Sequence, residues 1–121
     1  MSLAASHHRI HYIEIAATDV AQAKQFYATV FGWSFEDYGP EYASFGAASA
    51  GINGGFRQRG PDEKTGEAAP LVVLYSADLK ATEAAIIAAG GTIIVPTFEF
   101  PGGRRFHFTD GVGNLLAVWS E

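Results

Sequence analysis

The sequence repeats one set of landmarks at a fixed interval of 59 residues. A strand-like apolar run ends at Asp19 and is followed by an apolar-periodic helix that ends at Gly32. The same order recurs at Asp78 and Gly91, and apolar positions superpose on apolar positions at this offset. An internal repeat of this kind predicts two equivalent supersecondary units that complete each other's core.

Hydrophobic periodicity changes in the same order within each repeat. Residues 10–16 are mostly β-branched or aromatic; Thr18 or Asp19 then supplies an N-cap, and apolar residues recur with helical spacing from Val20. A second helix is expected from about Leu79 to the glycine pair before Thr92. The predicted strands cover residues 10–16, 33–37, 42–46, 52–56, 71–76, 92–95, 104–109 and 115–119. The sequence therefore predicts an α+β fold of two tandem βαβββ modules.

The length of 121 residues suits one domain, because either half alone would be too small to bury a sufficient core. We expect modules at about residues 9–56 and 70–120. The polar, turn-rich stretch 57–69 is the expected linker, and residues 1–8 are an expected flexible start. An apolar content of 48% and a charged content of 17% are typical of a folded globule.

Charge and cysteine usage exclude several classes of function. The net charge of −5 argues against a nucleic-acid partner, which would need a basic face. No stretch approaches the roughly 20 consecutive apolar residues of a membrane span, so no membrane partner is expected. The absence of cysteine excludes disulfides, thiolate zinc sites and cysteine nucleophiles. A reducing compartment fits this composition, and we predict a cytoplasmic protein.

Four segments carry a family resemblance. Residues 19–27 followed by 30–33 resemble the first helix and its exit in the glyoxalase/bleomycin-resistance/dioxygenase superfamily, also called the vicinal oxygen chelate fold. Residues 89–91 and 108–114 resemble the landmarks of its second half. The late turn departs from the family pattern, since Gly111 stands where the family often has proline.

The resemblance covers residues 9–120 and implies an architecture as well as a range of activities. It implies that the modules form an open, cup-shaped mixed β barrel with the helices outside, a ligand in the concave cup and, often, a homodimer. The activities that it implies include metal-dependent isomerases, epimerases and ring-cleaving dioxygenases, besides metal-free antibiotic-binding proteins.

The metal-ligand positions that the resemblance implies hold no suitable side chains. They fall on Tyr12, Leu71, Ala117 and Gly54 or a neighbour of Gly54. Divalent metals of this family need imidazole nitrogen or carboxylate oxygen, and a register error of one residue would offer only His11. We therefore expect no cofactor, and a divalent metal would need an unusual ligand set.

Strand alternation predicts which side chains line the cup, since residues two apart share a face. The polar and aromatic residues assigned to it are Tyr12, Glu14, Tyr75, Arg105, His107, Thr109 and Trp119; Asn53, the polar residue of the glycine-rich segment 51–55, is a further candidate. Glu14 and His107 are the candidate acid and base, and the others are candidate ligand contacts. The alternatives are structural: Glu14 paired with Arg105, His107 as a partly buried histidine, and the aromatic residues as packing residues.

Two functions from different classes follow. One is a metal-free, bleomycin-resistance-like protein that holds a small, partly apolar molecule in the cup. The other is a lyase, isomerase or dioxygenase that uses Glu14 and His107 as acid and base, or as unusual metal ligands together with His11. A third possibility is a subunit whose cup is filled by a partner chain.

Overall fold

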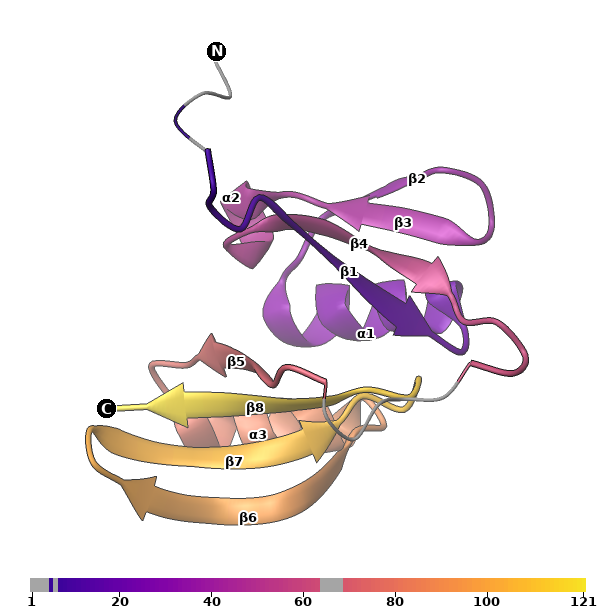
Figure 1. The fold of residues 1–121 in the computed structure, drawn as a ribbon. Helices are drawn as coiled ribbons and strands as arrows, with labels where there is room; N and C mark the ends of the chain where they lie inside the picture. Colours follow the sequence, from indigo (N-terminus) through magenta and orange to yellow (C-terminus); the bar gives the residue numbers. More distant parts are fainter. Residues whose placement is uncertain (1–4, 6, 64–68) are drawn as a thin grey trace.

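The computed structural model describes residues 5, 7–63 and 69–121 as two modules (Figure 1). The first module contains β1 (Tyr12–Ala17), α1 (Val20–Phe31), β2 (Phe35–Asp37), β3 (Tyr42–Phe45), α2 (Ala47–Ala50) and β4 (Asn53–Gln58). The second contains β5 (Val72–Tyr75), α3 (Leu79–Ala88), β6 (Thr92–Phe100), β7 (Gly103–Thr109) and β8 (Leu115–Ser120). No helix within the described ranges is long and apolar enough to cross a membrane.

Each module carries one four-stranded sheet, and the strand order repeats. The orders are β1-β4-β3-β2 and β5-β8-β7-β6. The pairs β1–β4 and β5–β8 are parallel, whereas the other neighbours are antiparallel. The predicted α+β fold with two βαβββ modules is therefore confirmed. The two mixed sheets do not close into one barrel, and α2 is an addition within the first module.

The two aspartates of the repeat begin equivalent helices. Asp19 caps α1 by accepting from the backbone N–H of Gln22 at 3.0 Å, and Asp78 caps α3 by accepting from Ala81 at 3.1 Å. Both caps satisfy a backbone donor that the first helical turn leaves unpaired. At the other end of α1, Gly32 adopts φ 72°, a left-handed conformation that favours glycine.

Two strands extend by two or more residues beyond their predicted ends. β4 continues through Gln58, so Arg57 belongs to the sheet and not to the linker. β6 continues through Pro96 to Phe100, because it is an edge strand whose pairing with β7 shifts register twice. Proline is tolerated at such edges and bulges because no ladder hydrogen bond is required there. Residues 1–4 and 6 of the expected flexible start, and 64–68 of the expected linker, lie outside the described residues.

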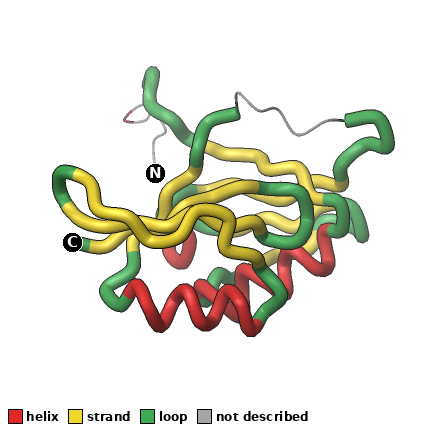
Figure 2. Tube along the Cα trace, turned by 90° about the horizontal axis from the view of Figure 1, so that it is seen from below, coloured by secondary structure: helices red, strands yellow, loops and turns green. Residues whose placement is uncertain are grey.

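The helices lie on one side of the two sheets and leave the opposite faces open (Figure 2). Aromatic rings fill the space beneath the first sheet, where Tyr27 of α1 packs 4.9 Å from Trp33 and 4.8 Å from Phe56 between ring centroids. Phe106 and Phe108 of β7 are fully buried beneath the second sheet. Phe26 stacks on Phe108 at 6.2 Å, so the core is continuous between the modules.

The turn between β7 and β8 links the two modules through hydrogen bonds. Buried Asp110 accepts from Tyr27 Oη at 2.9 Å, from the N–H groups of Val112 and Asn114, and from Asn114 Nδ2 at 3.0 Å. Asn114 Nδ2 also donates to the carbonyl of Ala16 in β1 at 2.9 Å. A carboxylate with four donors is stable in the interior because its charge is fully hydrogen-bonded. Part of the segment that carries the family resemblance therefore has a structural role.

Candidate functional site

Alternation along the strands presents polar side chains on the open faces. In β1, Ile13 and Ile15 pack against the core, whereas Tyr12 and Glu14 are exposed. In β7, His107 lies between two fully buried phenylalanines and therefore projects from the opposite face. On β8 the residue that pairs with His107 is Ala117.

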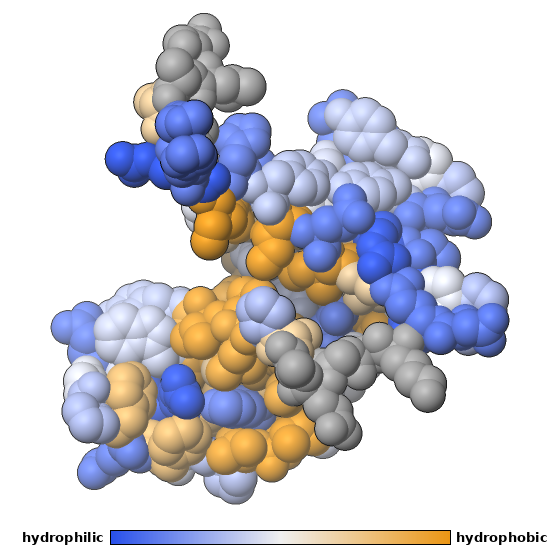
Figure 3. Space-filling view, in the orientation of Figure 1, coloured by the Kyte–Doolittle hydropathy of each residue, from blue (hydrophilic) through white to orange (hydrophobic). Residues whose placement is uncertain are grey.

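A cleft of about 710 Å³ is lined by residues of both modules. Figure 3 shows a hollow between the two modules, in the orientation of Figure 1, with apolar side chains on both of its edges. The residues that line the cleft are Ile13, Glu14, Ile15, Ala16, Arg59, Glu63, Ala69, Pro70, Leu71, Val72, His107, Gly113, Asn114, Leu115 and Leu116. Glu14 and His107, the predicted acid and base, thus come from different modules and border the same space. Such a mainly apolar wall with a few polar groups is typical of small-molecule sites.

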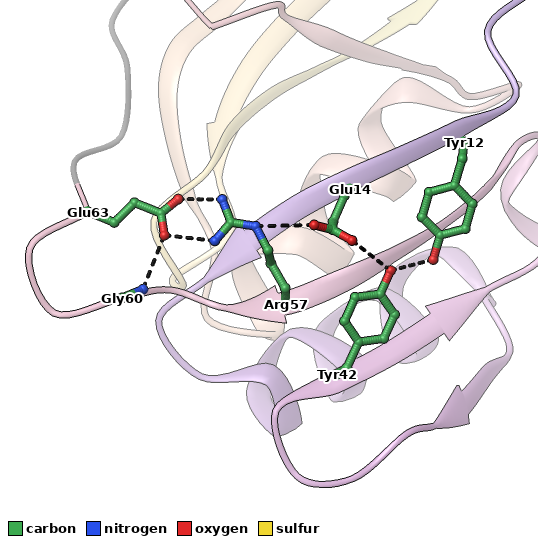
Figure 4. Close-up of polar contacts among 6 residues, drawn as sticks. All are labelled: Tyr12, Glu14, Tyr42, Arg57, Gly60 and Glu63. Carbon is green, nitrogen blue, oxygen red and sulfur yellow. Dashed lines mark hydrogen bonds and ion pairs between the residues drawn. The ribbon is translucent and has the colours of Figure 1, made fainter.

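Glu14 belongs to a chain of polar contacts on the first sheet (Figure 4). Its carboxylate accepts from Tyr42 Oη at 3.1 Å and lies 3.4 Å from Arg57 Nε. Tyr42 Oη also shares a hydrogen bond with Tyr12 Oη, and Arg57 forms a bidentate ion pair with Glu63. The structural alternative for Glu14 was an ion pair with Arg105. This expectation is wrong, because the arginine that pairs with Glu14 is Arg57.

This chain of contacts perturbs two ionisable groups. Hydrogen bonding to Arg57, then to the backbone of Gly60, lowers the pKa of Glu63 to about 2. Desolvation, followed by the hydrogen bonds with Tyr12 and Glu14, raises the pKa of Tyr42 well above its usual range. Tyr42 is therefore a neutral hydrogen-bond donor at physiological pH, and the ion pair with Glu63 persists under ordinary conditions.

A second concavity, of about 690 Å³, lies on the first module beside Tyr12. Asn53 and His11 also line it. The Oδ1 atom of Asn53 accepts from the N–H of Ala47 at 2.8 Å, at the start of α2. Asn53 therefore helps to hold α2 in place, in addition to facing this concavity.

An aromatic cluster covers the open face of the second sheet. Tyr75 and Trp119 pack edge to face at 5.1 Å, and Tyr75 Oη donates to Glu121 Oε1 at 2.8 Å. The guanidinium of Arg105 lies over the rings of Phe98 and Phe100. Burial, followed by the charge of Arg105, lowers the pKa of His107, so its imidazole is neutral at pH 7.

The predicted site residues therefore fall into three places. Glu14 and His107 line the cleft, Tyr12 and Asn53 line the concavity of the first module, and the remaining aromatic residues and Arg105 form the cluster on the second sheet. Thr109 ends β7 and is not among the residues that line either concavity in the described chain.

Sequence reasoning missed four residues that shape these places. Tyr42 and Arg57 contact Glu14, and Phe98 and Phe100 support Arg105. Arg57 falls in the expected linker, and the two phenylalanines lie beyond Val95, the end of the predicted strand. The glycine-rich start of β4 did contain a signal, because glycine within a strand indicates the close approach of a neighbouring group. That neighbour is Tyr42, whose Cζ atom would lie 2.6 Å from a Cβ on Gly55.

The parallel pairing refines the metal-ligand position on β4. Glu14 pairs with Gly55 in the first module, as Val73 pairs with Ala117 in the second. The position equivalent to Ala117 is therefore Gly55, the neighbour of Gly54, and it also lacks a ligand atom. His11 borders the first concavity and His107 the cleft. Within the described ranges, no three His, Cys, Asp or Glu side chains gather closely enough to hold a metal ion.

The sequence matches a known protein family. The model described as Glyoxalase/Bleomycin resistance protein/Dioxygenase superfamily matches residues 9–118. The chain belongs to this superfamily. It is 28% identical over 117 residues to proteins named Putative glyoxylase CFP32 from Mycobacterium bovis and Mycobacterium tuberculosis, covering 90% of the chain. The chain spans only 44% of the length of these curated relatives.

Solved structures of other proteins share the fold. A glyoxalase/bleomycin resistance protein/dioxygenase family enzyme from Burkholderia phytofirmans PsJN superposes with a TM-score of 0.75 at 19% identity, covering 90% of this chain and 95% of that one. TioX from Micromonospora sp. ML1 gives a TM-score of 0.68 at 22% identity, covering 91% and 96%. At these identities the likeness shows a common fold.

Proposed function

We propose that this protein binds a small, partly apolar molecule in the cleft between its two modules, without a resident metal. The observation that carries the proposal is the cleft of about 710 Å³, which is walled by aliphatic side chains from both modules and bordered by Glu14 and His107. The membership of a superfamily that includes bleomycin-resistance proteins supports the same kind of ligand. The non-coordinating residues at the family's metal positions favour binding without a metal.

Calorimetric titration with a neutral bicyclic probe, 2-naphthamide, tests the proposal. Leu115 lines the cleft and is 45% exposed, so Leu115→Glu places a charge in the apolar wall without filling the core. We expect at least a tenfold loss of affinity, because the charge would have to be desolvated by the probe. Ile87→Glu is the matched control, since Ile87 is 55% exposed on α3 and lies away from the cleft lining. Failure of the wild-type protein to bind the probe, or an equal loss in both variants, would contradict the proposal.

The second candidate function is acid–base catalysis in the same cleft. It is favoured by the presence of Glu14 and His107, from different modules, in the lining of one cleft, together with the neutral state of His107, which can accept a proton. The probe is hydroxyacetone, whose carbon-bound protons exchange with deuterated solvent when a base removes them. Proton NMR should show exchange above the buffer rate, and Glu14→Gln and His107→Gln should each slow it. Exchange equal to buffer alone, or equal slowing by the control Glu36→Gln, would contradict catalysis of this type.

We also propose that the protein forms a homodimer through the β5 edge of the second sheet. Val73 and Tyr75 of the outer strand β5 are 42% and 52% exposed, and Leu71, which directly precedes the strand, is 37% exposed. Contact with another chain along such an apolar sheet edge is favourable, because it removes the exposed apolar side chains from water. Sedimentation should give a dimer at micromolar concentration, whereas a monomer there would contradict the proposal.

A further inference from the structure

Arg105 is held on an aromatic support instead of in an ion pair. Its Cζ atom lies 5.3 Å from the ring centroid of Phe98 and 5.5 Å from that of Phe100. Phe100 in turn contacts Trp119 with 6.3 Å between ring centroids. Contacts of a guanidinium with aromatic rings are favourable and restrict the orientation of its plane. Arg105 is therefore oriented before any ligand arrives.

The charge of Arg105 has no acceptor within the described chain. No carboxylate of the described residues lies within ion-pair distance of it, in contrast to Arg57, which is paired with both Glu14 and Glu63. Its Nε atom is buried without a hydrogen-bond partner. The two η nitrogens also make no hydrogen bond in that part of the chain and are not among the buried atoms, so they remain accessible. Two parallel N–H donors in one plane match the two oxygens of a carboxylate.

Arg105 also lies near a residue that lines the cleft, His107. It precedes His107 by two residues on the same face of β7, which is a separation of about 7 Å along a strand. The rings of Phe98 and His107 contact each other at 5.8 Å between centroids, and His107 lines the cleft. A molecule that fills the cleft beyond His107 can therefore extend an acidic group to the guanidinium.

We propose that Arg105 is an anion-recognition site and that the ligand is a small aromatic or conjugated carboxylic acid. The carboxylate of the ligand pairs with the guanidinium, while its apolar body lies in the cleft. The placement of the apolar body rests on the proposed function. A monoanion fits better than a phosphate dianion, because one guanidinium supplies the charge and the protein carries a net charge of −5. Trp119 and Tyr75 supply ring surfaces near Arg105 for a planar ligand.

Calorimetric titration with two probes of the same shape separates the charge from the ring. The probes are 2-naphthoate and the neutral 2-naphthamide, and acetate and inorganic phosphate serve as anions without a ring. We expect wild-type protein to bind naphthoate at least tenfold more tightly than naphthamide and both ringless anions weakly. Arg105→Met should remove this preference, and Arg105→Lys should retain part of it through charge alone. Arg104→Met is the matched control, because Arg104 is the exposed neighbour on the opposite face of β7.

The outcomes distinguish this inference from the proposed function. Binding of naphthamide with no preference for naphthoate overturns the anion site and leaves the cleft as a binding site. A preference that survives in Arg105→Met, or disappears equally in Arg104→Met, overturns the assignment to Arg105. If neither naphthalene compound binds, both proposals fail. Thermal unfolding of each variant, followed by circular dichroism, confirms that the comparison is made between folded proteins.

Discussion

Tyr27→Phe removes a hydrogen bond between the modules and leaves the surrounding packing in place. The hydroxyl of Tyr27 donates to the buried carboxylate of Asp110 at 2.9 Å. The Tyr27 ring lies among the rings of Trp33, Phe56 and Phe26, and phenylalanine keeps these contacts. The substitution therefore tests the polar link between the modules with little change in volume.

The expected loss of stability follows from the partners that Asp110 keeps. A hydrogen bond to a charged group contributes about 1.5 to 3 kcal/mol. After Tyr27→Phe, Oδ1 still accepts from the N–H groups of Val112 and Asn114, and Oδ2 still accepts from Asn114 Nδ2. Since neither oxygen is left without a donor, we expect the lower part of this range, about 1.5 to 2 kcal/mol. Asp110→Ala should cost more, because it leaves four donors without their acceptor.

Thermal and urea unfolding measure the effect. A loss of this size corresponds to a decrease in melting temperature of roughly 5 to 10 °C for a domain of this length. Tyr38→Phe is the matched control, because Tyr38 is 60% exposed, and we expect a change below about 0.5 kcal/mol. Equal stability of Tyr27→Phe and wild type would refute the reasoning, since it would show that the buried carboxylate gains nothing from the hydroxyl.

Three more predictions concern pH, packing and metal. Burial, then the charge of Asp110, raises the pKa of Tyr27. The protonated Tyr27 hydroxyl therefore contributes fully to the free energy of unfolding below about pH 10, and this contribution declines as the pH rises further. Urea unfolding from pH 9 to 11.5 should show a smaller loss of stability with pH in Tyr27→Phe than in the wild type. Gly55→Ala should destabilise by roughly 1 to 3 kcal/mol in the same assay, because its Cβ would displace Tyr42, whereas Gly60→Ala should be nearly neutral. A chelator should leave the melting temperature unchanged, because bound metal would otherwise stabilise the folded state; a decrease would reveal a metal site.

The sequence predicted the repeating elements because local signals determine them. Asp19 and Asp78 cap their helices through side chains that reach only three residues along the chain, and Gly32 ends α1 by its own conformational freedom. The faces of β7 followed from alternation, which is a property of any strand. The end of β6 was missed because Pro96 is a local signal for termination, whereas the edge position that tolerates it depends on the whole sheet.

The amino-acid sequence by itself determined two βαβββ modules, the start of each long helix, and the alternation of faces along β1 and β7. Tertiary structure decided which candidates meet, because contacts between modules depend on how two sheets pack, and spacing along the chain does not encode that. It joined Glu14 to Arg57, brought Glu14 and His107 into the lining of one cleft, and left Arg105 on an aromatic support. Asp110 shows the same division: its turn was visible in the sequence, but the partner that fastens the modules, Tyr27, lies 83 residues away.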